Sequence, residues 1–206
     1  MVPRPSEGGA PSRRLTIVSS HHRVYTPLAG GACAMQTGWM TIERSEPAFH
    51  LAEREMLDAW LDYHRATLAF MCEGVSDDQL RKLAVPPSTM SLLGLVRHMA
   101  DVEANWFRRV LSGEDDCRSY RSDTNPDGDF NDVETAAVEA DFSCWRSECD
   151  NARTVSAPLA LDDRGTGKSG DPISLRWIYV HMIEEYARHN GHADLLRQCI
   201  DGSVGD

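Results

Sequence analysis

Apolar residues recur every three or four positions in four long stretches of the chain, which is the spacing of one buried face on an α-helix. The first stretch runs from about Pro47 to Cys72. Its recurring positions are Phe49, Met56, Leu57, Trp60, Leu61, His64, Leu68 and Met71. We therefore predict a first helix over this stretch.

The second stretch begins at Ser91 and stops at Gly113. Serine commonly caps the N-terminus of a helix and glycine commonly ends one, so both boundaries agree with the pattern between them. The apolar positions are Leu92, Leu95, Val96, Met99, Val102, Trp106, Phe107, Val110 and Leu111. These residues predict a second helix.

Two further stretches predict a third and a fourth helix. The third is marked by Val138, Phe142, Trp145, Cys149 and Ala152 and ends near Ser156. The fourth runs from Leu175 to about Ile200, with Ser174 as its expected cap and Gly202 beyond its end.

The connections carry turn residues and no convincing strand. Ser76 can cap a short turn through Leu83, and Pro86 with Pro87 prevents a helix before the second stretch. An acidic segment over 114–132 and a glycine-containing loop over 157–173 join the remaining helices. We predict an all-α fold, an antiparallel four-helix bundle, because this arrangement buries four apolar stripes in the simplest way.

We assign the bundle to residues 41–202 as one domain, a size that 206 residues accommodate. Residues 1–40 are broken throughout by Pro, Gly, Ser and Arg and contain no apolar segment of signal-peptide type. We predict a disordered tail there. Met35 and Met40 both stand just ahead of the first helical pattern, and we expect the native chain to start at one of them.

Composition narrows the classes of partner. The formal net charge is −11, which argues against nucleic acid because binding to a phosphate backbone depends on a basic face. No apolar run approaches the roughly 20 residues that a membrane helix needs, so we expect a soluble protein without a membrane partner. The six cysteines form no Cys-x-x-Cys pair, and we expect reduced thiols in the cytoplasm.

The fourth helix carries the candidate chemistry. His181, Glu185, His189 and His192 follow one another at spacings of four, four and three, and therefore share one helical face. Glu185 and His189 differ by about 40° in direction and about 6 Å in height, so both can reach one ion. His181 and His189 are about 12 Å apart along the axis, too far for both to be ligands. Spacing therefore leaves three pairs open: His181 with Glu185, Glu185 with His189, and His189 with His192.

A purely structural interpretation is an intrahelical ion pair for Glu185 with semi-buried histidines beside it. Against it, four titratable groups on a face that a bundle buries are expensive to desolvate unless a cation or a polar network compensates them. His98 also lies mid-helix among apolar residues of the second stretch and is expected to point inward. Bundles assemble metal sites from such facing side chains, and Asp101 or Asn105 is our candidate to orient its other ring nitrogen.

The segments SLLGLVRHMADVEANWF (Ser91 to Phe107) and SLRWIYVHMIEEYARHNGHADLLRQCIDG (Ser174 to Gly202) resemble the DinB-like metalloenzyme superfamily. The resemblance covers roughly Glu43 to Gly202 and is nearest to the branch common in mycothiol-producing bacteria. It implies a four-helix bundle in which one histidine of the second helix joins two residues four apart on the last helix. The ligands that it implies here are His98, Glu185 and His189.

The bundle is also similar to that of the mycothiol-dependent maleylpyruvate isomerases, which use Glu at the position of Glu185. Those isomerases carry a second, C-terminal domain that helps to form their active site, so we expect the chemistry of the bundle rather than isomerisation. The mixed ligand set suits zinc, with nickel, iron or manganese also compatible. The resemblance implies mycothiol as the thiol cosubstrate, a small electrophile as its partner, and a homodimer, as in many related bundles.

We therefore predict a metal-dependent thiol S-transferase, with Tyr186, Arg188 and His192 as candidate substrate-binding residues because they lie beside the ligands in sequence. The rival interpretation is a non-enzymatic, stress-associated binding protein with a structural or vestigial metal site. An open ligand position favours catalysis, whereas a fourth protein ligand such as His192 would close the site.

Overall fold

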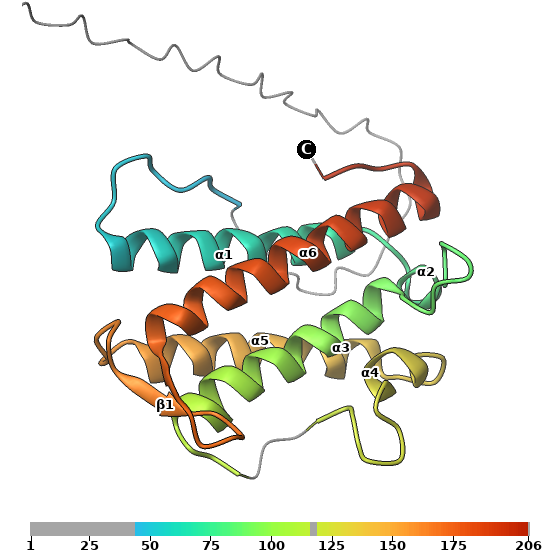
Figure 1. Cartoon of the computed structure of the whole chain (residues 1–206). Coiled ribbons are helices and arrows are strands. Elements are labelled where there is room, and N and C mark those ends of the chain that lie inside the picture. Colours follow the sequence, from blue (N-terminus) through green and yellow to red (C-terminus); the bar gives the residue numbers. More distant parts are fainter. Residues whose placement is uncertain (1–43, 116–118, 206) are drawn as a thin grey trace, which may run out of the picture. The chain divides into compact units, whose positions relative to one another are not determined.

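The computed structural model describes residues 44–115 and 119–205, and this part of the chain is mostly helical. The expected tail over residues 1–40 and the expected start at Met35 or Met40 lie outside the described residues. The four long helices are α1 (Glu53–Cys72), α3 (Leu92–Glu103), α5 (Val138–Ser156) and α6 (Leu175–Asp201). A π-helix, η1 (Ala104–Leu111), continues α3 without a break (Figure 1). All four predicted helices are therefore present.

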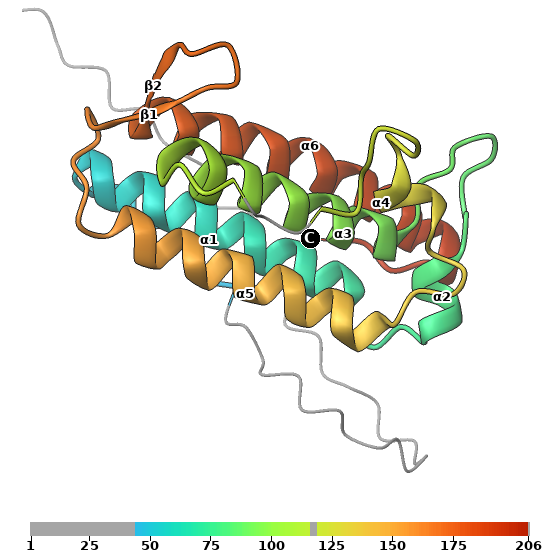
Figure 2. The same ribbon diagram turned by 90° about the horizontal axis from the view of Figure 1, so that it is seen from below.

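The long helices pack in pairs: α1 lies along α6, and α3 with η1 lies along α5. Helix α6 also contacts α3, so these two helices bring their facing side chains together. Figure 2 shows the four long helices with their axes roughly aligned. Their apolar stripes meet in a common core, whose fully buried members include Leu61, Leu68, Leu95, Met99, Phe142, Ile178 and Met182.

Sequence signals at the helix ends are largely confirmed. The side chain of Ser91 accepts a hydrogen bond from the Gly94 N–H, and Ser174 accepts one from the Trp177 N–H. Gly202 ends α6 with a φ of 83°, in the left-handed region that favours glycine. Ser76 caps a short helix, α2 (Asp77–Arg81), as the expected turn.

The expected start of the first helix near Pro47 is wrong, because α1 begins at Glu53. Phe49 belongs to the apolar pattern but is 79% exposed, so burial does not stabilise a helical turn around it. Hydrophobic periodicity identified this helix correctly and placed its N-terminus one to two turns too early.

A hairpin corrects the expectation of a fold without strands. Strand β1 (Arg164–Thr166) pairs antiparallel with β2 (Pro172–Ser174), with Gly165 opposite Ile173. The hairpin lies against η1, and a Cβ atom at Gly165 would be only 2.1 Å from the Val110 carbonyl oxygen. Glycine at this position allows the close approach of the two backbones.

A buried polar cluster joins all four long helices. The Nε and NH2 groups of Arg65 on α1 donate to the two carboxylate oxygens of Glu103 at the end of α3, each at 2.7 Å. The Tyr186 hydroxyl of α6 donates to Glu103 Oε1 at 2.7 Å, and the Trp145 Nε1–H of α5 donates to the Tyr186 oxygen at 2.9 Å. Glu103 is 0% exposed. We call these four residues the core polar cluster.

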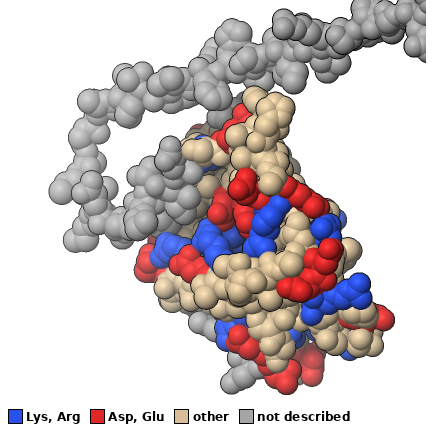
Figure 3. Space-filling view, turned by 90° about the vertical axis from the view of Figure 1, so that its left-hand side faces the viewer, with Lys and Arg blue, Asp and Glu red and all other residues tan. Residues whose placement is uncertain are grey.

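No helix in the described part of the chain is both long enough and apolar enough to cross a membrane. On the face drawn in Figure 3, Lys and Arg are interspersed with Asp and Glu rather than gathered into a basic surface. The cysteines among residues 44–115 and 119–205 are free thiols, and burial raises the pKa of Cys72 to about 12.

The core polar cluster predicts that Arg65→Ala lowers the free energy of unfolding by about 3–5 kcal/mol, because the buried Glu103 carboxylate loses its cation. The matched control is Arg153→Ala, which removes an exposed ion pair with Asp62 and is expected to cost about 1 kcal/mol or less. Equilibrium unfolding in urea measures both values. Equal losses in the two variants would contradict the assignment.

Candidate metal centre

His98 lies in the middle of α3 with one ring nitrogen already engaged. Its Nδ1 is 2.8 Å from Oδ2 of Asp129, which belongs to the short helix α4 (Gly128–Asn131) and whose side chain is 1% exposed. A carboxylate at this distance favours the tautomer in which Nδ1–H donates. The lone pair of Nε2 is then available for another partner.

Arg97, the neighbour of His98, determines where Asp129 lies. Its guanidinium donates to the carbonyl oxygens of Gly128 at 2.9 Å and Asp132 at 3.0 Å, at the two ends of α4. A Cβ atom at Gly128 would lie 2.3 Å from the Tyr120 carbonyl oxygen, so glycine permits this close packing. These contacts fasten α4 to α3 with Asp129 facing His98.

The expectation that Asp101 or Asn105 orients His98 is wrong. The Asp101 carboxylate accepts hydrogen bonds from the Ser119 hydroxyl and the Tyr120 N–H. The Asn105 side chain accepts from Arg109. Both candidates were chosen for their nearness in sequence, whereas the actual partner is 31 residues further along the chain.

Glu185 and His189 of α6 face His98 across the contact between α3 and α6. Glu185 Oε2 is 3.4 Å from His189 Nε2, and the ring centroids of His98 and His189 are 4.6 Å apart. One ligand atom from each of the three residues lies within 4.8 Å of the other two. Their side chains are 15%, 19% and 11% exposed for His98, Glu185 and His189, so solvent still reaches the group.

Burial, and after it the electrostatic effect of the neighbouring His98 and His192, lower the pKa of His189 to about 4. A neutral imidazole is therefore the form present near neutral pH. This is the form that binds metal ions, because the coordinating nitrogen must carry a lone pair.

The structure also keeps the other two pairs close. His181 Nε2 is 3.5 Å from Glu185 Oε1, and a group of His181, Glu184 and Glu185 meets the same distance criterion. That group comes from α6 alone, and Glu184 is paired with Arg188. His192 Nδ1 is 3.4 Å from His189 Nδ1, which is the nitrogen of His189 directed away from Glu185. Of the two candidate ligand groups within residues 44–115 and 119–205, the one with His98 joins two helices.

The candidate substrate-binding residues lie in three different settings. Tyr186 is 0% exposed and its hydroxyl belongs to the core polar cluster, so it presents no surface to a ligand. Arg188 is exposed and pairs with Glu184 one turn earlier. His192 is half-buried beside His189 and is the candidate nearest to the three predicted ligands.

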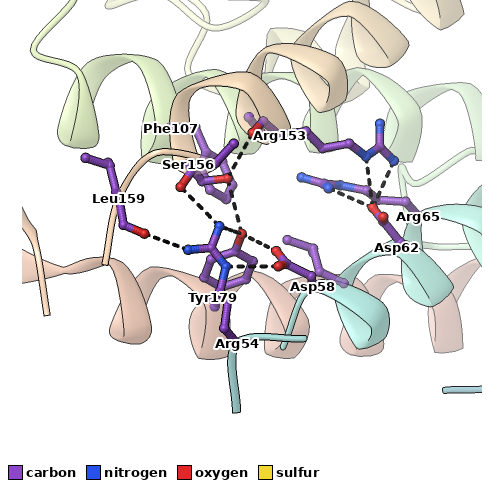
Figure 4. A pocket seen from close by; sticks show the side chains of 12 residues that line it. Arg54, Asp58, Asp62, Arg65, Phe107, Arg153, Ser156, Leu159 and Tyr179 are labelled. Carbon is purple, nitrogen blue, oxygen red and sulfur yellow. Dashed lines mark hydrogen bonds and ion pairs between the residues drawn. The ribbon is translucent and has the colours of Figure 1, made fainter. Parts of the chain in front are cut away.

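A separate cavity of about 510 Å³ lies between α1, α5 and the start of α6. Its charged groups are matched with one another (Figure 4). Arg54 bonds Asp58 and the carbonyl oxygens of Ser156 and Leu159, and Asp62 accepts from Arg153. Because these donors already have partners, the cavity is a weaker candidate site than the His98 group.

A comparison with known protein families shows to which family a chain with this fold and these residues belongs. The model of the family described as mycothiol-S-transferase matches residues 56–202. The chain belongs to this family. The match extends from α1 to the end of α6 and includes His98, Glu185 and His189. The family is part of the DinB-like superfamily, which confirms the resemblance seen in the sequence. No curated protein matches the chain.

The three residues fit a divalent metal ion as a donor set. Two imidazoles and one carboxylate are ligands that zinc and related ions accept, and three protein ligands leave one position open. Asp129 supplies the carboxylate that commonly accompanies a ligating histidine. In this member of the mycothiol-S-transferase family the group therefore combines three residues that could hold a metal ion with a carboxylate that orients one of them.

We expect Asp129→Asn to weaken zinc binding about 10- to 100-fold, because the amide no longer fixes the His98 tautomer. Competition with a chromophoric chelator measures the affinity. Asp132→Asn, on an exposed residue at the end of the same helix, is the control and is expected to keep wild-type affinity. Equal affinities for Asp129→Asn and wild type would remove Asp129 from the site.

The lowered pKa of His189 predicts how the metal-free protein responds to acid. Below its ordinary pKa of about 6.5 the unfolded state takes up a proton, whereas folded His189 does so only near pH 4. The stability present above pH 6.5 is therefore lost progressively as the pH falls towards 4. Urea unfolding in the presence of a chelator should show this loss.

The His189→Asn variant should show a smaller loss over the same pH range, and exposed His50→Asn should behave like wild type. The pKa of His64 is also lowered by burial, and its contribution to the acid-induced loss of stability is the same in all three proteins. Identical pH profiles for wild type and His189→Asn would contradict the prediction.

Proposed function

We propose that this protein is a metal-dependent thiol S-transferase, in which an antiparallel four-helix bundle holds a divalent ion through His98, Glu185 and His189. The thiol is mycothiol and the second substrate is a small electrophile. The observation that carries the proposal is the convergence of these three ligands from α3 and α6 in a chain of the mycothiol-S-transferase family.

Zinc is the ion that we propose, because a tetrahedral site with nitrogen and oxygen ligands and one open position is typical of catalytic zinc. Nickel, iron and manganese accept the same donors. A divalent cation held by these residues would stabilise a thiolate over a thiol and make the sulfur nucleophilic at neutral pH.

The chain's own residues prepare the group for this ligand. Asp129 accepts the Nδ1–H of His98 and directs Nε2 towards α6. His189 stays neutral because its pKa is lowered, and Glu185 supplies the one negative charge of the ligand set. The side chains remain partly exposed, which leaves access for a thiol from solvent.

The transfer exchanges one bond at the electrophilic carbon. The thiol gives its proton to solvent, the sulfur forms a bond to the carbon, and the leaving group departs with the electron pair of its own bond. The products are a thioether and the released leaving group. No electron is transferred to or from an external acceptor.

The alternative is a non-enzymatic, stress-associated binding protein with a structural or vestigial metal site. A structural site requires a fourth protein ligand. His192 is the nearest candidate, but its Nδ1 approaches the His189 nitrogen that is directed away from Glu185. This geometry favours an open site, and with it an enzyme. We also propose that the protein is located in a reducing cytoplasm and forms a homodimer, as expected from the sequence.

The test is metal content measured by mass spectrometry on untagged protein, followed by thiol-transfer assays. We expect about one equivalent of metal in wild type and its loss in His98→Ala, Glu185→Ala and His189→Ala, because each removes one of three ligands. Transfer of mycothiol to an electrophile should fall at least 100-fold in the same three variants.

Two histidine variants complete the design. His50→Ala removes an exposed histidine ahead of α1 and should keep both metal and activity. His192→Ala should keep the metal if the site is open and lose it if His192 is a fourth ligand. Wild-type protein that neither carries nor takes up metal would exclude the proposed mechanism and leave the non-enzymatic alternative.

A further inference from the structure

Three aromatic rings form a cluster one helical turn from Glu185. Trp106 comes from η1, and Trp177 and His181 come from α6. The ring centroids are 5.1 Å apart for Trp106 and Trp177, 4.7 Å for Trp106 and His181, and 4.9 Å for Trp177 and His181. We call these residues the aromatic triad. Trp106 packs against the hydrophobic core, and Trp177 is 48% exposed.

The triad adjoins the candidate metal centre directly. His181 Nε2 is 3.5 Å from Glu185 Oε1, while the other oxygen of this carboxylate faces His189. A ligand bound beside Glu185 therefore lies next to the triad, along the contact between α3 and α6. Trp177, His181, Glu185 and His189 follow one another every four residues along one side of α6, while Trp106 and His98 come from η1 and α3.

The π-helix contributes to the position of Trp106. In an ideal α-helix, the eight residues from His98 to Trp106 would rotate the Trp106 side chain about 80° away from the direction of the His98 side chain. Residues of a π-helix rotate less per step because each turn contains more of them. The wider turn of η1 thus brings Trp106 back towards α6, where its ring contacts Trp177 and His181. Such turns are often found at functional sites.

Trp177 has a large apolar surface that the fold leaves uncovered. Its side chain is 48% exposed, and one face of the indole stacks on the His181 ring with an interplanar angle of 15°. Aromatic rings bury the most area per side chain and have electron-rich faces. A second planar ring can therefore stack on the triad without displacing any core residue.

We propose that the aromatic triad binds the electrophilic substrate through an electron-poor planar ring. This inference rests on the proposed thiol transfer and specifies its substrate class. Aromatic carbons react with thiolates when electron-withdrawing groups deplete the ring, and the same depletion strengthens stacking on the electron-rich face of an indole. The substrate class is thus an activated arene or a comparable flat, electron-poor electrophile, rather than a small aliphatic one.

Binding is tested with two unreactive probes of similar size, 1,3-dinitrobenzene and its electron-rich counterpart 1,3-dimethoxybenzene. In an NMR titration of isotope-labelled protein, the Nε1–H group of each tryptophan gives a separate signal. The signals of Trp106 and Trp177 are assigned from the spectra of variants substituted at these positions. We expect dinitrobenzene to shift these two signals and to bind about fivefold more tightly than dimethoxybenzene.

Trp177→Ala should weaken dinitrobenzene binding about five- to tenfold, and Trp106→Phe should weaken it less because an aromatic ring remains. The matched control is Val180→Ala, which removes an exposed apolar side chain from the same helix outside the triad. The proposal is overturned if Trp177→Ala binds like wild type, if the two probes bind equally, or if the shifts spread over tryptophans outside the triad.

The same titration on wild type and on His189→Ala separates this inference from the proposed function. Dinitrobenzene should bind His189→Ala like wild type, because the triad contains none of the three proposed metal ligands. Ring binding by a wild-type protein that shows no thiol transfer would show that the thiol-transfer proposal has failed while the ring site stands. Thiol transfer by wild type without ring binding at the triad would show that the ring site has failed while the thiol-transfer proposal stands.

For an active enzyme, Trp177→Ala should raise the KM for 1-chloro-2,4-dinitrobenzene and leave the KM for iodoacetamide unchanged.

Discussion

The ion pair between Arg65 and Glu103 is the interaction on which the arrangement of the helices depends. A carboxylate that is 0% exposed is tolerated only with a cation and further hydrogen bonds in good geometry, and Arg65 and Tyr186 provide both. Each partner must therefore point inward from its own helix. Tyr186 is adjacent to Glu185, and Glu103 follows His98 by five residues, so the same contacts fix the rotation of α6 and of α3. The core polar cluster thus helps to orient α3 and α6 so that the three proposed metal ligands face each other.

The two polar groups between the long helices differ in how their charged side chains are compensated. In the core polar cluster, Glu103 has a cation and a hydroxyl, and Trp145 completes the tyrosine's hydrogen bonding. In the candidate metal-centre group, the ion-pair partners of Glu185 among the described residues are His181 and His189 rather than a Lys or Arg, and the pKa of His189 is lowered. Burial thus keeps the His189 imidazole unprotonated, the form that can bind a metal ion. A divalent cation is the partner that we propose for this set of atoms.

Much of the fold was predictable because its information is local. Apolar periodicity and capping residues identified the four long helices, and spacing reduced the ligand choice on α6 to three pairs. Asp129 was not predictable from spacing, because its position depends on α4 docking to Arg97 through backbone carbonyl groups that no side-chain pattern encodes. The hairpin depends similarly on the close approach of Gly165 to η1. By contrast, Arg65 between Leu61 and Leu68, and Glu103 between Met99 and Phe107, are charged residues at core positions, and this conflict signals the core polar cluster in the sequence itself.

The choice of glutamate at position 185 has a consequence that a histidine there would not have. A carboxylate has two oxygens on one carbon, and here Oε2 faces His189 while Oε1 faces His181 of the aromatic triad. An imidazole has a single lone pair in its neutral form, so a histidine that served the metal centre would lose the contact with His181 or present an N–H to it. Glu185 can serve both neighbours at once. It thereby lies between the proposed thiol site and the rings proposed to hold the electrophile, so on these two proposals the residue at position 185 helps to align the two substrates.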